Sequence, residues 1–381
     1  LVTTISLIPG VSIPTLGLTL PIGISFYTFQ TMSYPIDLYR GDAEVQRNYI
    51  RFGTFVALFP QLIAGPIVRY STIAKQIEER KITMDGFSEG TLIFLRGFNK
   101  KILLANVLAE VADAAFGSSE ASVGMSWLGA VCYMLQIYFD FGGYSDMAIG
   151  LGKMLGFDFE KNFDYPYISG TVTEFWRRWH ISLGSWFRDY VYFPMGGSRV
   201  SSKTLLIRNL FVVWLLTGIW HGAEWTFLLW GVLYGALITA EKLTGLPKKL
   251  SETGGARKTL YRVFTLLMIL LGWVLFRSEN LTQAGDYFRS MFGLNHRALM
   301  DDGTIFYFRE YLVTLAAGIL CSTPLFAWLR GKMEGRGGAC AATAEACASR
   351  ACEISVSMVQ LTAMLPSRRT TPLRSPPRAS N

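Results

Sequence analysis

Two of the three histidines in this 381-residue chain lie in strongly apolar, tryptophan-rich surroundings. His180 stands in EFWRRWHISLGSW, and His221 stands in LLTGIWHGAEW. Burying an imidazole in or near hydrocarbon costs free energy unless partners satisfy its ring nitrogens, so both are candidate functional residues. A neutral imidazole suits either a base, which takes a proton from a hydroxyl group, or a hydrogen-bond acceptor.

The position of His221 favours a functional role over a structural one. It follows the apolar run FVVWLLTGIW, which ends at Trp220, and it precedes Gly222 and Ala223. The next apolar run begins at Trp225. We predict that His221 lies at a bend between two embedded segments, whereas His296, in the polar segment LNHRALMDDG, is a surface residue.

The segment around His180 predicts a helix. Thr171 and Glu174 have capping-box spacing, so we expect a helix that begins near Thr171 and carries His180 on its third turn. Arg177 would then lower the pKa of His180, and Gly184 would leave space beside its ring. An interfacial helix, with tryptophan and arginine at the level of the lipid headgroups, explains the same residues equally well.

Two carboxylates follow the apolar run 124–139. Asp140 and Asp146 are separated by Gly142 and Gly143, which we expect to bend or break a helix. The carboxylates either pair with basic residues at the membrane interface or line a polar cavity, and the sequence leaves both possibilities open. The glycine-rich run GGYSDMAIGLG predicts close helix packing.

The composition indicates an all-helical, polytopic membrane protein. The chain is 51% hydrophobic and 17% charged, whereas soluble domains hold about 25% charged residues. A bilayer-spanning helix needs roughly 20 apolar residues. The runs predicted to be embedded are 1–36, 124–139, 210–220, 225–240, 264–276 and 311–329, with 102–116 as a weaker candidate. The net charge of +8 fits basic cytoplasmic loops and gives no reason to expect nucleic-acid binding.

The segment 52–68, FGTFVALFPQLIAGPIV, contains two prolines and is flanked by basic loops on both sides. A complete crossing would place one of these basic loops outside the cell. We therefore predict a re-entrant segment, which is tolerated where irregular backbone is buried in protein or lines a cavity.

The chain divides by composition into a membrane domain, residues 1–336, and a low-complexity tail, residues 337–381, predicted to be disordered or aberrant. Because the chain starts in an apolar stretch without methionine, we expect further helices upstream. The tail holds Cys340, Cys347 and Cys352 without a following histidine, so we predict no metal site.

Five segments in order resemble the membrane-bound O-acyltransferase (MBOAT) family, in the branch of alginate O-acetyltransferases (AlgI) and D-alanyl transfer proteins (DltB). They are LPIGISFYTFQTMSYPIDLYRG, FPQLIAGPIVRY, YFDFGGYSDMAIGLGKMLGF, FWRRWHISLGSWFRDYVYFPMGG and GIWHGAEWTFLLWG. The resemblance implies a ring of transmembrane helices and short re-entrant helices around a central tunnel. It also implies that His221 is the catalytic base and His180 the second histidine of the tunnel.

The resemblance further implies an acyltransferase that moves an acyl group, most simply acetyl, across the membrane for O-acetylation of an exported polysaccharide such as alginate. We expect no bound cofactor and a donor such as acetyl-CoA or another acyl thioester. The expected location is the inner (cytoplasmic) membrane, among lipid, with an extracytoplasmic SGNH-type acetyltransferase as partner. The alternatives are D-alanyl transfer to teichoic acid and, outside enzymes, a polytopic transporter, which would tend to show an internal repeat of broken helices.

Charged residues near the histidines are candidates for supporting roles. Arg177, Arg178 and Arg188 would hold anionic parts of a carrier or neighbouring carboxylates, with contact to lipid headgroups as an equally good explanation. Asp189 would orient a histidine.

Overall fold

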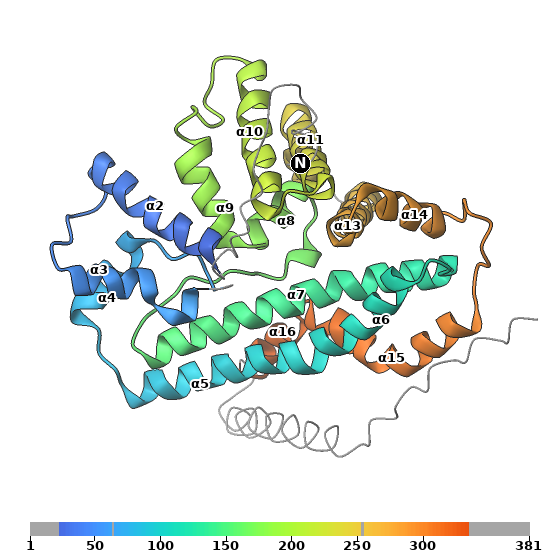
Figure 1. The fold of residues 1–381 in the computed structure, drawn as a ribbon, viewed down its shortest axis with the longest axis horizontal. Coiled ribbons are helices and arrows are strands. Elements are labelled where there is room, and N and C mark those ends of the chain that lie inside the picture. The colour runs from blue at the N-terminus through green and yellow to red at the C-terminus, as the bar shows by residue number, and fades with distance from the viewer. Residues whose placement is uncertain (1–22, 63–64, 253–254, 335–381) are drawn as a thin grey trace, which may run out of the picture. The chain divides into compact units, whose positions relative to one another are not determined.

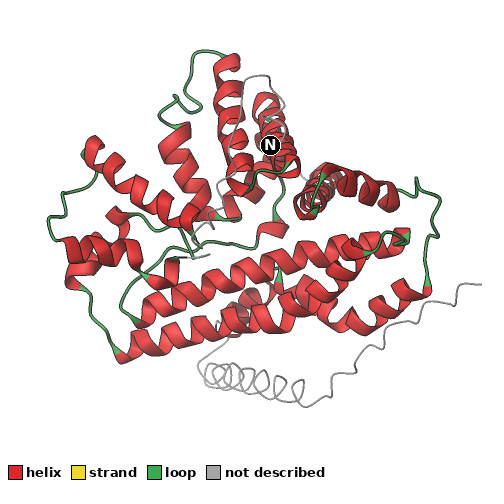
Figure 2. Cartoon of the chain, viewed as in Figure 1, coloured by secondary structure: helices red, strands yellow, loops and turns green. Residues whose placement is uncertain are grey.

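The computed structural model describes residues 23–62, 65–252 and 255–334, and the regular secondary structure in these ranges is helical (Figure 2). The predicted all-α fold class is therefore confirmed. The longer elements are α2 (Ile24–Arg40), α3 (Tyr49–Ala57), α4 (Tyr70–Glu79), α5 (Met84–Asn99), α6 (Asn106–Gly117), α7 (Val123–Met154), α10 (Lys203–His221), α11 (Trp225–Thr244), α13 (Ala256–Arg277), α14 (Leu281–Met291), α15 (Asp302–Cys321) and α16 (Leu325–Glu334).

Short helical elements connect them. These are η1 (Phe59–Gln61), the π-helical η2 (Lys100–Ala105), η3 (Pro166–Ile168), α8 (Val172–Arg178), α9 (Ile181–Phe187), the π-helical η4 (Arg188–Tyr192) and α12 (Leu246–Glu252). The described residues divide into two units, one that ends at residue 324 and one that begins at residue 325 and consists of α16.

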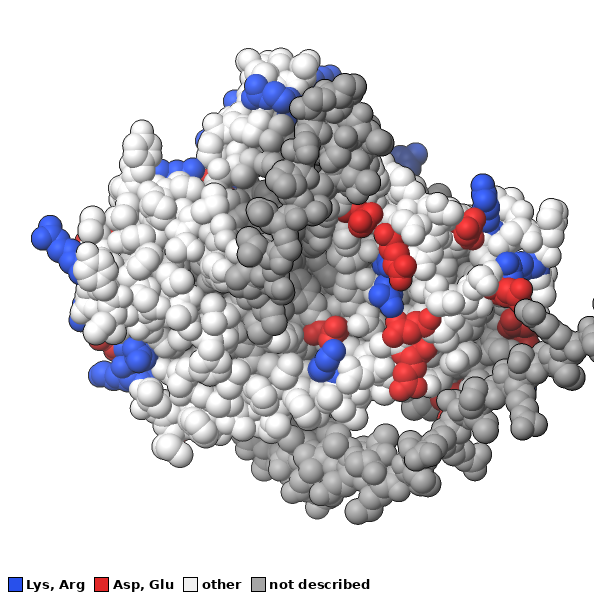
Figure 3. Space-filling model, in the orientation of Figure 1, with Lys and Arg blue, Asp and Glu red and all other residues white. Residues whose placement is uncertain are grey.

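Four of the described helices, α10, α11, α13 and α15, are long and apolar enough to cross a membrane. On the face shown in Figure 3, the charged side chains gather in a few groups, and the rest of the described surface is uncharged. Three of the predicted runs, 210–220, 225–240 and 264–276, fall within α10, α11 and α13. Of the predicted run 1–36, residues 1–22 lie outside the described residues.

The prediction of one embedded segment over residues 311–329 is wrong in its position. Helix α15 begins earlier, where the Asp301 carboxylate accepts a hydrogen bond from the backbone N–H of Thr304 at 2.7 Å. It ends at Cys321, because Pro324 lacks a backbone N–H and its ring disfavours helical backbone in the residue before it. The apolar stretch is thus divided between α15 and α16.

Helix α7 is continuous through Gly142 and Gly143, so the predicted bend or break is wrong. The glycines instead allow close approach to α5, which runs alongside α7 (Figure 1). A Cβ atom at Gly143 would lie 2.7 Å from the carbonyl oxygen of Gly97, and one at Gly150 would lie 2.6 Å from that of Gly90. Small residues commonly permit such contact between helix backbones, and the predicted close packing is confirmed.

An aromatic cluster joins α8 to α10, α11 and α13. The Trp176 ring lies 4.8 Å from Trp214 and 4.9 Å from Tyr234, measured between ring centroids. Trp179 lies 4.8 Å from Trp273 by the same measure. Because α10 and α11 pack side by side (Figure 1), this cluster fixes the short helix α8 against them.

The segment 52–68 forms the end of α3, the short η1 and an extended stretch that follows the undescribed residues 63 and 64. None of these pieces is among the four helices suited to crossing a membrane. Re-entry into the membrane stays a prediction, as does the ring around a central tunnel.

Replacing Gly143 with alanine tests the α5–α7 contact. We expect G143A to lower the free energy of unfolding by about 1–3 kcal/mol, because the added methyl group meets backbone atoms that cannot move aside. Thermal unfolding of the purified protein in detergent measures the effect. The matched control is Gly285→Ala in α14, where a Cβ atom would meet nothing within 4 Å. Equal melting temperatures for the two variants would contradict the packing described.

Candidate active site

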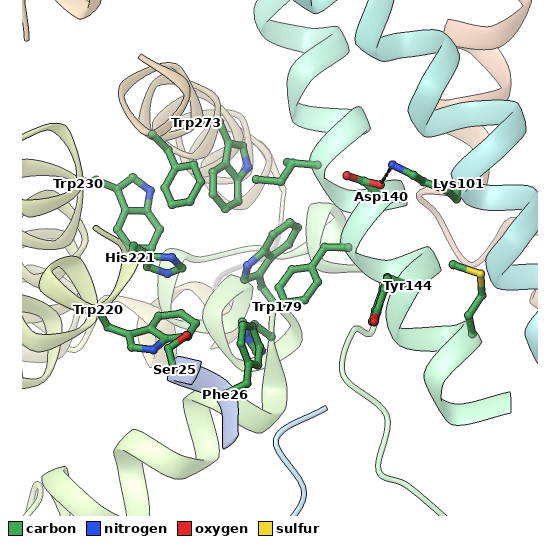
Figure 4. A pocket seen from close by; sticks show the side chains of 15 residues that line it. Ser25, Phe26, Lys101, Asp140, Tyr144, Trp179, Trp220, His221, Trp230 and Trp273 are labelled. Atoms are coloured by element: carbon green, nitrogen blue, oxygen red, sulfur yellow. Dashed lines mark ion pairs between the residues drawn. The ribbon is translucent and has the colours of Figure 1, made fainter. Parts of the chain in front are cut away.

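A cavity of 580 Å³ lies between α2, η2, α7, the α8–α9 junction, α10, α11 and α13. His180 and His221 both line it. Figure 4 shows His221 between Trp220 and Trp230, with Ser25 of α2 close by and the ion pair of Lys101 and Asp140 across the cavity. The walls are therefore mainly aromatic, and the charged groups lie on the side of α7.

His221 is the last residue of α10, and α11 begins at Trp225, so the histidine lies at a bend between two helices, as predicted. Its ring is surrounded by the edges and faces of aromatic side chains. The centroids of Trp220, Trp230 and Phe276 lie 4.6, 4.9 and 5.2 Å from that of the imidazole. This environment is apolar, and none of the ion pairs among the described residues involves the ring, so no charged partner there favours its protonation.

Gly222 allows the tight connection after His221. A Cβ atom at this position would lie 2.6 Å from the ring of Phe227. The glycine thus lets Phe227 pack close to the end of α10. Phe227 in turn lies 6.4 Å from His221 between centroids, with the two rings nearly parallel.

His180 does not lie within a helix, and the predicted third-turn position is wrong. Helix α8 does begin after Thr171, whose hydroxyl accepts a hydrogen bond from the backbone N–H of Glu174, but it ends at Arg178. His180 adopts the left-handed backbone conformation, with φ 46° and ψ 56°, and α9 begins at the next residue. Non-glycine residues are uncommon in this conformation.

The helix ends at this point because another segment forms hydrogen bonds with the backbone on both sides of His180. The N–H of Asp164 donates to the carbonyl of Arg178, and the N–H of Ile181 donates to the carbonyl of Asn162, both at 2.9 Å. The loop around residue 163 therefore pairs with the α8–α9 junction. Since α8 does not continue, the helical spacing that was expected to place Arg177 and Gly184 beside the His180 ring is absent.

The side chain of Asn162 also reaches this junction. Its Oδ1 atom accepts hydrogen bonds from the backbone N–H of Ser182 at 3.1 Å and from the Ser182 hydroxyl at 2.9 Å. The same oxygen lies 3.3 Å from Nδ1 of His180. The other ring nitrogen, Nε2, has no hydrogen-bond partner among the described residues.

His180 is only 3% exposed. Burial lowers its pKa to about 3, with nearby His221 as the smaller cause, so its imidazole is neutral at physiological pH. The sequence predicted a lowered pKa but attributed it to Arg177, whose side chain is exposed in the structure. That attribution is wrong, because the dominant cause is desolvation.

A buried carboxylate positions the start of α8. Glu241 of α11 is 1% exposed, and its two oxygens accept the backbone N–H groups of Val172 and Thr173 at 2.7 and 2.8 Å. The Tyr261 hydroxyl donates to the same carboxylate at 2.8 Å. A negative charge at a helix N-terminus is favourable, and α8 is thereby held at one end by Glu241 and at the other by the Asn162 loop.

Of the two acidic candidates on α7, only Asp140 lines the cavity, where it pairs with Lys101. Asp146 pairs with Lys100 at 2.6 Å and does not line this cavity. The sequence left open whether the two carboxylates pair with basic residues or line a cavity, and Asp140 does both. Asp146 pairs with a basic residue but does not line this cavity.

The charged candidates around the α8–α9 region lie apart from the cavity. Arg178 binds Glu174 at 3.0 Å and Asp164 at 3.2 Å, which stabilises the junction. Arg188 and Asp189 lie in η4 and line a separate cavity of 170 Å³. The structure therefore brings together His180, His221, Trp220 and Asp140, and it leaves the arginines and Asp189 outside this group.

Asp189 is held by arginines and does not orient either histidine. Its carboxylate accepts hydrogen bonds from Arg188 at 2.8 Å and Arg69 at 2.7 Å. Although burial raises the pKa of Asp189, these hydrogen bonds outweigh it and lower the pKa below its ordinary value. Its role is to neutralise the two guanidinium groups.

Sequence reasoning missed three residues that shape the site: Lys101, Asn162 and Glu241. Lys101 had a usable signal, since it precedes the apolar run 102–116 and needs a counter-charge. Glu241 directly follows the predicted embedded run 225–240, which also points to a partner. Asn162 had none, because its importance comes from a contact 18 residues away in the sequence.

No group of three or more His, Cys, Asp or Glu side chains suited to a metal ion occurs in the described ranges. The two candidate histidines are surrounded mainly by aromatic rings. Both imidazoles are placed to act directly on a bound molecule in the cavity.

Comparison with known proteins gives a family and several relatives. Residues 41–281 match the family model of MBOAT, the membrane-bound O-acyltransferase family. A protein of Pseudomonas syringae pv. tomato named "Probable alginate O-acetylase AlgI" is 51% identical over 273 residues, which cover 72% of this chain and 52% of the relative. The chain thus spans about half the length of this relative.

Two further relatives carry different names. A "Peptidoglycan O-acetyltransferase" of Helicobacter pylori is 35% identical over 310 residues, covering 74% of this chain and 58% of the relative. A "Teichoic acid D-alanyltransferase" of Bacillus subtilis is 28% identical over 232 residues, covering 57% of this chain and 58% of the relative.

Glu241→Ala tests whether the buried carboxylate positions α8. We expect the variant to lose at least about 2 kcal/mol of unfolding free energy, because hydrogen bonds to a charged group are lost and two backbone N–H groups are left buried without an acceptor. Thermal unfolding followed by tryptophan fluorescence reports the change. Glu224→Ala is the matched control, since Glu224 is exposed and its side chain does not cap α11. A melting temperature for E241A equal to that of E224A would refute this role.

Proposed function

The chain belongs to the membrane-bound O-acyltransferase family, and from this premise we propose that it transfers an acetyl group to hydroxyl groups of an exported polysaccharide, with alginate as the expected acceptor. The observation that carries the proposal is the placement of His180 and His221 on one aromatic-walled cavity. The 51% identity to a protein named for alginate O-acetylation supports the choice of acyl group and acceptor.

In the proposed reaction, His221 acts as general base. Its neutral ring takes the proton of the acceptor hydroxyl while the oxygen attacks the carbonyl carbon of an acyl thioester. The tetrahedral intermediate collapses by breaking the carbon–sulfur bond, and the imidazolium returns its proton to the leaving thiolate. The products are an acetyl ester and a free thiol.

We propose the indole N–H groups of Trp220 and Trp230 as hydrogen-bond donors for the oxyanion of the intermediate. The indole N–H groups of Trp220 and Trp230 have no hydrogen-bond partner in the part of the chain that the structure describes. Both residues line the cavity and contact the His221 ring. Donors in a dry, rigid site stabilise developing negative charge at little reorganisation cost.

The donor that we propose is acetyl-CoA or another acyl thioester. The volume of the cavity, 580 Å³, is sufficient for the reacting end of such a molecule together with an acceptor hydroxyl. The ion pair of Lys101 and Asp140 supplies a polar side to the cavity, where the more hydrophilic parts of the substrates can lie.

The family and the named relatives also support a proposal for the protein's location and for its partner. We propose that the protein lies in the inner (cytoplasmic) membrane and works with an extracytoplasmic SGNH-type acetyltransferase that completes the transfer to the polymer. D-alanyl transfer to teichoic acid is less well supported, because the relative with that name is 28% identical rather than 51%. Membership in an acyltransferase family also argues against a transporter.

Replacing His221 in the full-length protein tests the proposal. We expect H221A to reduce the acetyl ester content of the exported polymer at least about a hundredfold, because a positioned general base contributes that much or more to the rate. Ester content per uronic acid measures the loss, and immunoblotting of membranes shows that the protein is still present.

The control for this variant is His296→Asn. His296 is exposed and has φ 56°, a conformation that asparagine tolerates, so H296N should acetylate normally. Undiminished ester content in H221A would overturn the proposed base. Disappearance of H221A from the membrane would show instead that His221 is needed for folding.

A further inference from the structure

We propose that Asn162 is a positioning residue that holds His180 in a single tautomer, with the proton on Nδ1 and the lone pair on Nε2. The inference concerns the second histidine of the cavity, and its activity readout rests on the proposed acetyl transfer.

The backbone N–H of Ser182 determines which way this amide faces. A peptide N–H can only donate, and it lies 3.1 Å from the side-chain atom of Asn162 assigned as oxygen. Placing the NH₂ group there would bring two donors together. The Oδ1 atom therefore faces Ser182, and the Ser182 hydroxyl donates to it as well at 2.9 Å.

The tautomer of His180 follows from the direction of the amide. Its Nδ1 atom lies 3.3 Å from Asn162 Oδ1 and 3.5 Å from the Ser182 hydroxyl oxygen. The amide oxygen can only accept, and the hydroxyl has already committed its hydrogen to that oxygen. Nδ1 must then carry the proton, which leaves the neutral ring with a bare lone pair on Nε2.

The backbone at His180 fixes the location of the imidazole ring, and the Asn162 amide fixes the tautomer of that ring. His180 is one of three described non-glycine residues with positive φ, and such strain persists where the surrounding structure determines it. Here the backbone carbonyl of Asn162 accepts a hydrogen bond from the N–H of Ile181, and the Asn162 side chain accepts one from the N–H of Ser182. One residue thus holds the two positions that follow the strained histidine.

The consequence is a defined role for His180 on the cavity. The ring lines the cavity, and Nε2 is buried there without a partner among the described residues, so its lone pair is not used by the protein. The aromatic rings of Phe141 and Trp220 lie beside the imidazole, at 4.7 and 6.3 Å between centroids. We assign to Nε2 the task of holding the acceptor hydroxyl while His221 removes its proton.

A double-mutant cycle in the full-length protein tests whether Asn162 acts through His180. Asn162→Ala should lower polymer acetylation by about tenfold or more, as is common for groups that orient a functional histidine. In a His180→Ala background, the same change should produce no further loss, because the group it positions is gone. Equal losses in both backgrounds would overturn the proposal.

The matched control is Ser185→Ala. The Ser185 hydroxyl donates to the carbonyl of Ser182 at 2.9 Å, one turn away, and does not touch His180 or Asn162. This variant should acetylate at the normal rate. A tenfold loss in S185A would show that any disturbance of the start of α9 has the same effect, and would contradict a specific role for Asn162.

A spectroscopic measurement on wild-type protein keeps the inference testable even when Asn162→Ala fails to fold. Nitrogen-15 chemical shifts of histidine-labelled wild-type protein distinguish protonated from bare ring nitrogens, and the signals absent from His180→Asn identify His180. We expect a protonated Nδ1 and a bare Nε2, and the reverse pattern would refute the proposal. This result is independent of acetylation, so failure of the proposed function and failure of this inference are distinguishable.

Discussion

The break between α8 and α9 at His180 is the constraint on which the site depends. Helix α8 ends after seven residues and α9 starts after two intervening residues, the second of which, His180, has a left-handed conformation. Three attachments hold this arrangement: Glu241 at the start of α8, the Asn162 loop at its end, and the aromatic cluster of Trp176 and Trp179 along its side. Without this break, α8 would continue as a helix and His180 would not be held at the junction beside Asn162.

Removal from water determines the protonation of the site, because it disfavours the charged form of an imidazole. Burial keeps His180 neutral, and aromatic edges surround His221 without supplying a counter-charge. The charged residues nearby are paired with one another, as Lys101 is with Asp140, so that they add polarity on one side of the cavity at limited electrostatic cost. The glycines that bring α5 and α7 together make this side compact, because they let the two helix backbones touch.

The sequence predicted those elements of the fold that depend on interactions between residues close together in the chain. The embedded helices α10, α11 and α13 followed from uncharged runs, and the bend at His221 followed from Gly222 and Ala223 after such a run. The position of His180 could not be predicted in this way, since a capping box at Thr171 favours a longer helix, and only the distant Asn162 and Asp164 end it. The continuity of α7 through Gly142 and Gly143 was likewise decided by packing against α5. The pairing of Glu241 with α8 joins residues about 70 positions apart, and no local pattern encodes it.

The central claim is that acyl transfer takes place in the cavity shared by the two histidines. Blocking that cavity from within tests it most directly. Ser25 lines the cavity beside Trp220 (Figure 4), and Ser25→Cys in the full-length protein introduces a thiol there with little change in size. The measurement is the acetyl ester content of exported polymer after treatment of cells with a membrane-permeant maleimide, with wild-type protein treated in parallel. The account predicts that labelled S25C stops acetylating while wild type continues, and undiminished acetylation by fully labelled S25C would contradict it.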